Sequence, residues 1–328
     1  MPLRLAVCQV QDVDPSIAAF ARQLGVTSIN ITTPHIPIEQ GYWRTDDLVL
    51  LRTRCEDLGL TLEVIENTPH NTYDKIMLGL PGRDEQLENY CRTIRNMAAA
   101  EIPILGFHFM PTSVWRTDMA APARGGSAAT AYDHSQVVNG NKVVWPSDAG
   151  ELRLTAAEMW NNYSVFLDAV LPVADEVGMK LAQHPDDPPV ESINGFARIF
   201  NSPENFIKAW ELAKGSPAWG LDLCLGTVSE MAGGEKAVES MIDYFGPLGK
   251  IRYVHFRDVQ GSVPKFQECF LGEGNYNPYA VIKRLIDVGF DGWLQDDHVP
   301  FMSEDTKYGH RARAHEIGYI QGILKSLS

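Results

Sequence analysis

Eight apolar segments alternate with helical patterns along the whole chain, and this alternation constrains the fold more than any other feature. The predicted strands cover residues 3–10, 27–32, 60–66, 102–110, 179–184, 219–225, 251–259 and 292–297. Helices are predicted to begin near Pro15, Thr45, Asp84, Thr155, Pro203, Pro278 and Thr306. Strands that alternate with helices form a parallel sheet, either closed or open. Eight units, without a Gly-x-Gly-x-x-Gly turn after the first strand, favour a single (β/α)₈ TIM barrel over residues 1–328 rather than an open doubly wound sheet.

Residues 111–150 interrupt this alternation after the fourth strand. The segment is rich in Gly, Ala, Ser and Pro, and it contains Trp115, Tyr132 and Trp145. It is too long for an ordinary connection between a strand and a helix. We therefore predict a lid-like or otherwise functional loop there.

Composition and charge exclude several classes of protein. The net charge of −14 argues against nucleic acid or an anionic membrane as a partner. No run of roughly 18 apolar residues suggests a membrane-spanning helix, and the first residues do not resemble a signal peptide. The five cysteines are scattered without a Cys-x-x-Cys motif, which favours a reducing cytoplasm over a disulfide framework. A homo-oligomer is possible, but no stretch identifies an interface.

Four consecutive predicted strands end on potential metal ligands. These are His184, Cys224, His255 and Asp297, each about one strand–helix unit from the next. In a (β/α)₈ barrel the catalytic groups lie at the C-terminal ends of the strands. Singly, each residue has an ordinary explanation as a core cysteine, a hydrogen-bonded histidine or a turn aspartate. Together, two imidazoles, a thiolate and a carboxylate at matching strand ends favour a site for a divalent transition metal.

Further residues at the same predicted rim are candidates for binding a substrate. The set comprises Glu66, His108, His35, Arg116, Arg257, Asp186 and Asp187. Arginines can hold a carboxylate through two hydrogen bonds. The two aspartates, in the stretch His184-Pro-Asp-Asp-Pro-Pro189, could contact substrate hydroxyls, orient metal ligands or only shape the loop. The sequence alone does not choose among these roles.

The motifs resemble the mannonate dehydratase family of xylose-isomerase-like barrels. The similarity is strongest over residues 161–178 and 184–189, and it extends to Phe109-Met-Pro111, Leu223-Cys224, 254–257 and Asp297-His298. The resemblance implies dehydration of D-mannonate, a small anionic sugar acid, to 2-dehydro-3-deoxy-D-gluconate in hexuronate (glucuronate) catabolism. It also implies a divalent metal, Mn²⁺ first, with Fe²⁺, Co²⁺ or Zn²⁺ as alternatives.

The resemblance assigns roles to individual residues. It makes His184, Cys224, His255 and Asp297 the metal ligands. It makes His298 and Tyr308 the acid/base candidates, without deciding which residue is the acid.

Several departures from the family pattern concern the substrate. The region after Pro111 is shorter, His108 stands where the family has an asparagine, and Phe266-Gln-Glu-Cys-Phe270 replaces a Phe-His-Glu pattern. A sugar isomerase or epimerase that uses the same metal to stabilise an enediolate is therefore the alternative function. A barrel that binds a sugar or a partner without catalysis is the third.

Overall fold

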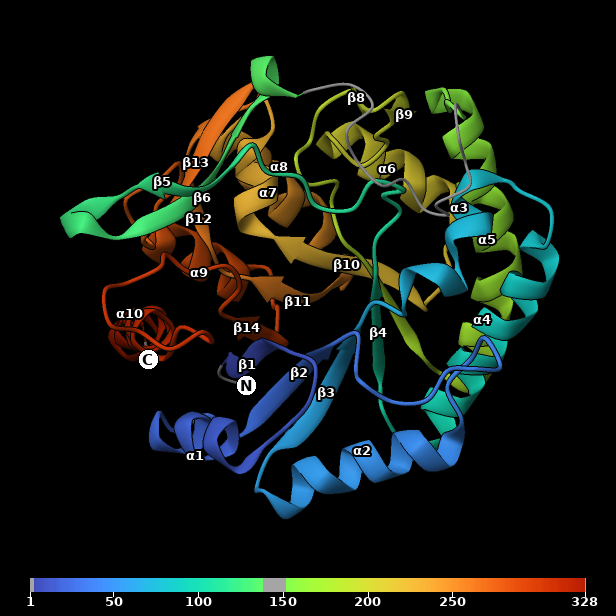
Figure 1. The fold of residues 1–328 in the computed structure, drawn as a ribbon, viewed down its shortest axis with the longest axis horizontal. Coiled ribbons are helices and arrows are strands. Elements are labelled where there is room, and N and C mark those ends of the chain that lie inside the picture. The colour runs from blue at the N-terminus through green and yellow to red at the C-terminus, as the bar shows by residue number, and fades with distance from the viewer. Residues whose placement is uncertain (1–2, 138–151, 328) are drawn as a thin grey trace.

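The computed structural model describes residues 3–137 and 152–327, and its centre is a closed barrel of parallel strands (Figure 1). Around the barrel the strand order is β1-β14-β11-β10-β7-β4-β3-β2, and β1 closes the ring against β14 with Ala6 opposite Gln295. The barrel strands are β1 (Arg4–Val10), β2 (Ser28–Thr32), β3 (Thr61–Glu66), β4 (Ile104–Phe107), β7 (Lys180–Gln183), β10 (Trp219–Cys224), β11 (Ile251–His255) and β14 (Trp293–Gln295). The predicted (β/α)₈ TIM barrel is confirmed.

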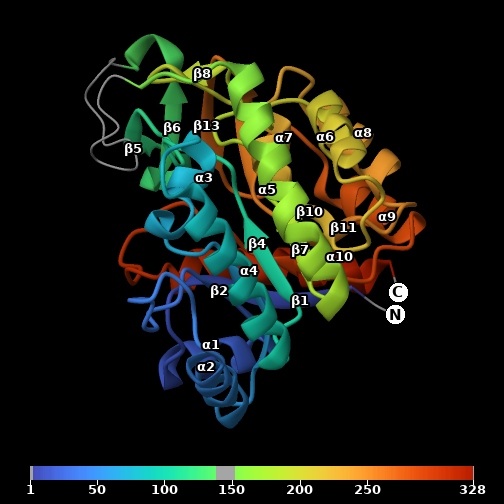
Figure 2. The same ribbon diagram turned by 90° about the vertical axis from the view of Figure 1, so that its right-hand side faces the viewer.

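Helices surround the barrel and bury their apolar faces against it (Figures 1 and 2). They are α1 (Pro15–Gln23), α2 (Thr45–Asp57), α3 (Asp74–Leu78), α4 (Arg83–Ala99), α5 (Ala156–Val177), α6 (Pro203–Leu212), α7 (Leu225–Glu230), α8 (Glu235–Phe245), α9 (Pro278–Asp287) and α10 (His310–Ser326). The start of α5 is a capping box in which Thr155 and Glu158 satisfy each other's backbone N–H groups. Among the described residues, none of these helices combines the length and apolarity that a membrane crossing requires.

The barrel interior is filled by side chains and is not a pore. Ala6, Val64, Ile104, Ala182, Tyr253 and Trp293 form a buried cluster there. Gly106 on β4 makes room for this filling, because a Cβ at that position would lie 2.2 Å from the Tyr253 hydroxyl oxygen. The packed interior leaves the C-terminal ends of the strands as the place for a site.

The segment after β4 corrects the prediction of a long loop. Its described part forms a hairpin of β5 (Asp118–Pro122) and β6 (Ala128–Asp133). This hairpin joins β12 (Asp258–Ser262) and β13 (Lys265–Cys269) in a second sheet of order β12-β13-β6-β5, which lies beside the barrel in Figure 1. Residues 138–150 of the predicted loop, Trp145 among them, fall outside the described residues. A role as a lid stays a prediction.

Some predicted boundaries were wrong for local reasons. The strand predicted at 251–259 is two strands, because the chain leaves the barrel after His255 and enters the second sheet at Asp258. The last helix begins at His310 and not near Thr306, since Gly309 has a left-handed φ of 85°. Helices α7 and α8 were not predicted. A short hairpin of β8 (Ser192–Ile193) and β9 (Phe196–Ala197) also follows β7.

Candidate active site

Three potential metal ligands meet at the ends of neighbouring barrel strands. His184 directly follows β7, Cys224 ends β10 and His255 ends β11. One donor atom from each lies within 4.8 Å of the other two. These residues were predicted to lie at the same rim, and the fold brings them together there.

The hydrogen bonds around this group leave lone pairs available for a cation. His184 Nδ1 lies 2.6 Å from the Pro185 carbonyl oxygen, so Nδ1 carries the hydrogen of the neutral ring and Nε2 keeps a lone pair. His255 Nε2 lies 2.8 Å from Glu66 Oε1. The other nitrogen, Nδ1 of His255, is buried without a hydrogen-bond partner in the described part of the chain. Outer hydrogen bonds of this kind orient metal-binding histidines, so these residues fit a divalent transition metal.

The surrounding charges favour the thiolate of Cys224. Burial raises the pKa of the Cys224 thiol, but Arg257 and the imidazoles of His184 and His255 outweigh burial and bring the pKa well below its ordinary value. Burial would lower the pKa of His184, but Asp222 and Cys224 raise it to about 9. Metal binding would displace the proton on Nε2 of the charged His184 ring, because a nitrogen that binds a metal must be deprotonated.

Asp297 lies beside the three-residue group and also has protein partners. Its Oδ2 is 3.7 Å from His255 Nδ1 and 3.8 Å from Cys224 Sγ. The same oxygen accepts a hydrogen bond from Arg257 Nε at 2.9 Å, and Oδ1 accepts one from Gln9 Nε2 at 2.8 Å. A cation bound by Asp297 would therefore share the carboxylate with Arg257. Its role as the fourth ligand stays a prediction.

Two buried acids lie next to His255. Glu66, a predicted substrate contact, lines the cavity and accepts hydrogen bonds from His255 Nε2 and, at 2.7 Å, from Gln295 Nε2. Asp222, which was not among the predicted site residues, has Oδ2 3.5 Å from His255 Nε2, and burial raises the pKa of Asp222 to about 7. Alternate residues of a strand face the same side. Asp222 lies two residues before Cys224, and this spacing was the signal that could have identified Asp222.

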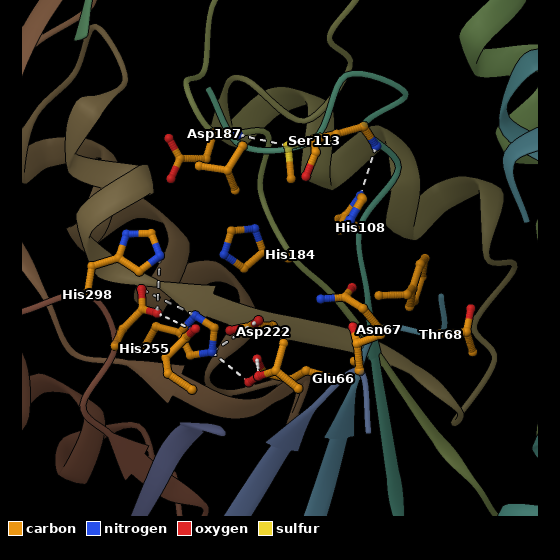
Figure 3. Close-up of a pocket in the computed structure, with 18 of the residues that line it drawn as sticks. Glu66, Asn67, Thr68, His108, Ser113, His184, Asp187, Asp222, His255 and His298 are labelled. Atoms are coloured by element: carbon orange, nitrogen blue, oxygen red, sulfur yellow. Dashed lines mark hydrogen bonds and ion pairs between the residues drawn. The ribbon is translucent and has the colours of Figure 1, made fainter. Parts of the chain in front are cut away.

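The group opens onto a cavity of about 290 Å³, close to the lower end of the range for small-molecule sites. In the view of Figure 3, His298 lies on one side of His184, while His108 and Asn67 lie on the other. Residues from β3, β4 and the segment after β14 thus contribute to one cavity.

His298 is the titratable residue best placed on the cavity wall. Its side chain is 33% exposed, and its Nδ1 lies 2.8 Å from Glu268 Oε1. Its Nε2 lies 3.8 Å from Asp297 Oδ1. Burial would lower the pKa of His298, but Asp297 and Glu268 raise it above its ordinary value. This placement suits the predicted acid/base role.

Arg116 and Arg257, which were predicted to bind a substrate carboxylate, are joined to buried acids. Arg116 forms an ion pair with Asp187, and its Nη2 lies 2.9 Å from Glu268 Oε1. Arg257 Nη2 lies 2.8 Å from Asp187 Oδ2, and its Nη1 lies 3.0 Å from Glu230 Oε1. Asp187 therefore serves as the counter-ion of both arginines. Contacts of either arginine with substrate stay predictions.

His108 forms the opposite wall as an uncharged ring. Its Nδ1 accepts the backbone N–H of Met110 at 3.2 Å, and its Nε2 lies 3.1 Å from the Tyr73 hydroxyl and 3.2 Å from His70 Nε2. Burial, with the nearby His70 and His184, lowers the pKa of His108 well below its ordinary value. A neutral imidazole at this place suits a hydroxyl group better than an anion.

Six predicted site residues do not line this cavity: Cys224, Arg116 and Arg257, described above, and His35, Asp186 and Tyr308. His35 is exposed. Asp186 is buried, and its Oδ2 accepts the backbone N–H of Phe200 at 2.8 Å. The Tyr308 hydroxyl donates to the Cys8 carbonyl oxygen at 3.0 Å, and Tyr308 lines a second cavity of about 510 Å³ that shares His298 with the first. The structure thus separates the two acid/base candidates, although His298 borders both cavities.

The family model described as D-mannonate dehydratase (UxuA) matches residues 11–145 and 151–328. This chain belongs to the mannonate dehydratase family. It is 33% identical over 325 residues to the mannonate dehydratase of Thermotoga neapolitana, covering 89% of this chain and 88% of the relative. It is 32% identical over 317 residues to mannonate dehydratase 2 of Halalkalibacterium halodurans, covering 88% and 89%.

Solved structures agree with this family assignment. The crystal structure of mannonate dehydratase from Streptococcus suis serotype 2 has a TM-score of 0.87 and 28% sequence identity, covering 99% of this chain and 95% of that one. A structure of L-ribulose 3-epimerase, 18% identical, has a TM-score of 0.62 over 99% of this chain and 95% of that chain, and it shows a shared fold only. The predicted family and the barrel fold are confirmed.

Proposed function

We propose that this mannonate dehydratase family member is a hydro-lyase that converts D-mannonate to 2-dehydro-3-deoxy-D-gluconate and water. The observation that carries the proposal is the group of half-buried His184 with buried Cys224 and His255, which opens onto a cavity with His298 on its wall. Removing the proton next to a carboxylate needs nearby positive charge and a proton acceptor, and loss of the 3-hydroxyl needs a proton donor. The residues of this cavity match those needs.

The group would hold a divalent metal, for which we propose Mn²⁺, with Fe²⁺, Co²⁺ and Zn²⁺ as alternatives. His184 Nε2, Cys224 Sγ and His255 Nδ1 supply three ligands in this proposal, and Asp297 supplies the fourth. When bound, the ion supplies positive charge that stabilises the negative charge developing on the substrate carboxylate.

The protein groups around the cavity handle the protons. His298 lies on the cavity wall with Nε2 available, so it exchanges a proton with the substrate. Tyr308 is the second candidate, but its hydroxyl donates to Cys8 and lies in the other cavity, which makes His298 the better placed of the two. His108 forms the opposite wall of the cavity, and because its ring nitrogens already bond to Met110, Tyr73 and His70, it contacts the substrate through the ring itself.

A cytoplasmic role in hexuronate catabolism is consistent with the chemistry of the chain. All five cysteines are free and buried, as expected in a reducing compartment. A thiolate ligand such as Cys224 also needs protection from oxidation. We therefore place the proposed reaction in the cytoplasm.

The test is a product assay. Purified protein with D-mannonate and Mn²⁺ should form a 2-keto-3-deoxy acid, which reacts with thiobarbituric acid after periodate oxidation. His298→Gln should keep its bound metal but form product at least about 100-fold more slowly. His315→Gln, which changes an exposed histidine of α10, is the matched control.

The alternative function predicts a different result. If D-mannonate and related hexonates yield no such product while a ketose exchanges its α-proton with solvent, the isomerase or epimerase assignment replaces this one.

A further inference from the structure

The ring of His298 is held from behind by a buried acid of the second sheet. Glu268 lies on β13 with its side chain 4% exposed, and its Oε1 is 2.8 Å from His298 Nδ1. The contact joins residues 30 positions apart. Glu268 thus contacts Nδ1 of the His298 ring. The other nitrogen, Nε2, lies 3.8 Å from Asp297 Oδ1.

The surroundings of Glu268 favour its ionised form. Arg116 Nη2 lies 2.9 Å from Glu268 Oε1, and Arg257 Nη1 lies 3.4 Å from it. Two guanidinium groups beside one buried carboxylate stabilise its negative charge. A carboxylate only accepts hydrogen bonds, so the hydrogen in the contact belongs to His298 Nδ1. In the neutral ring, Nε2 is then the nitrogen that takes up a proton.

Arg116 is itself fixed within the segment that follows β4. Its Nε donates to Thr130 Oγ1 at 3.0 Å, its Nη1 donates to the Trp115 carbonyl oxygen at 3.1 Å, and it pairs with Asp187. Thr130 lies on β6, and β6 pairs with β13, which carries Glu268. In Figure 2 β6 and β13 lie close together at the top of the molecule. The second sheet therefore carries the acid, and through Thr130 it fixes the cation beside that acid.

We propose that Glu268 is a positioning residue, which accepts the Nδ1–H of His298 so that Nε2 faces the substrate, and that Arg116 holds Glu268 in place. The proposal rests on the proposed function of His298 as the acid/base residue. In this proposal the segment after β4 stabilises the position of His298, because that segment carries Arg116. The competing explanation is that Glu268 only balances the charge of Arg116 and Arg257.

The first test is a double-mutant cycle on the metal-loaded enzyme. Glu268→Gln should lower kcat roughly 10- to 100-fold with KM within about threefold, as expected for an outer-shell partner. If Glu268 acts through His298, the double variant Glu268→Gln/His298→Gln should be no slower than His298→Gln alone. Losses that multiply would overturn the proposal. Glu273→Gln is the matched control, because Glu273 pairs with Arg124 at the surface.

The second test needs no substrate. Histidine labelled with ¹⁵N in the Zn²⁺-loaded wild type should show the neutral His298 ring protonated at Nδ1, with the signal assigned by its loss in His298→Gln. A neutral ring protonated at Nε2 would overturn the proposal, even if Glu268→Gln failed to fold. An absence of product from D-mannonate would count against the proposed function and leave this result standing.

Discussion

Replacing Glu66 by glutamine should weaken metal binding while the barrel stays folded. Glu66 is buried, and its Oε1 accepts hydrogen bonds from His255 Nε2 at 2.8 Å and from Gln295 Nε2 at 2.7 Å. Glutamine keeps the shape and an acceptor oxygen but removes the charge. His255 Nδ1, the nitrogen proposed to face the metal, then becomes less basic and less firmly oriented.

The size of the effect follows from that one lost charge. A hydrogen bond to a charged group contributes about 1.5–3 kcal/mol, and a neutral one contributes about 1 kcal/mol. The substitution should therefore cost about 0.5–2 kcal/mol of metal-binding free energy. Since about 1.4 kcal/mol corresponds to a factor of ten, we expect the dissociation constant for Mn²⁺ to rise about tenfold. This agrees with the roughly 10- to 100-fold losses typical of outer-shell partners.

Titration of metal-free protein with Mn²⁺, with free Mn²⁺ followed by electron paramagnetic resonance, measures this change. Glu63→Gln is the matched control, because Glu63 lies on the same strand and accepts a hydrogen bond from Ser28 Oγ at 3.1 Å. A dissociation constant for Glu66→Gln within about twofold of the wild type would refute the reasoning. An equal loss in Glu63→Gln would show that the effect is not specific to His255.

Three further substitutions address the ligand, a buried charge and a loop. Cys224→Ser should reduce metal retained after dialysis at least about tenfold, because a hydroxyl is a poorer ligand than a thiolate; atomic absorption measures this, with Cys91→Ser as control. Burial raises the pKa of Asp186 from 3.8 to about 6, so its stabilising proton is fully present below about pH 4 and is lost as the pH passes 6. Asp186→Asn should therefore gain up to about 3 kcal/mol over the wild type between pH 4 and 8 in urea unfolding, and a pH-independent difference would contradict this. Asp258 accepts the backbone N–H groups of Val259, Gly272, Gly274 and Asn275. Asp258→Ala should therefore lower the free energy of unfolding by about 3 kcal/mol. A loss below about 1 kcal/mol would count against this expectation.

The barrel was predictable because its strands are buried on both faces. Every residue of β10 is buried, and such strands appear in the sequence as continuous apolar runs between helices. The second sheet lacked that signal. Four of the five residues of β5 are exposed, and three of the six residues of β6 are alanine, so neither strand stands out from the small residues around it. The pairing of β6 with β13 joins residues more than a hundred positions apart along the chain.

The candidate ligands were predictable for a different reason, because each lies where a predicted strand ends. Their partners were not. His255 meets Glu66 across 189 positions, and Arg116 meets Glu268 across 152, separations that a strand-end argument does not connect. Asp222 was within reach of strand periodicity, since it shares a face with Cys224. The sequence thus indicated the rim of the barrel better than the ion pairs behind it.

Those ion pairs change how an anionic substrate would be recognised by a chain with a net charge of −14. Arg116 and Arg257 are the obvious partners for a sugar-acid carboxylate, yet both are already neutralised by buried acids, Asp187 and Glu268 among them. Breaking such a buried pair costs about 3–5 kcal/mol. This is more than the stabilisation that one exposed ion pair with a carboxylate contributes. Under the proposed function, the metal is then the main positive charge offered to the substrate carboxylate. Loss of the metal should accordingly weaken substrate binding as well as turnover.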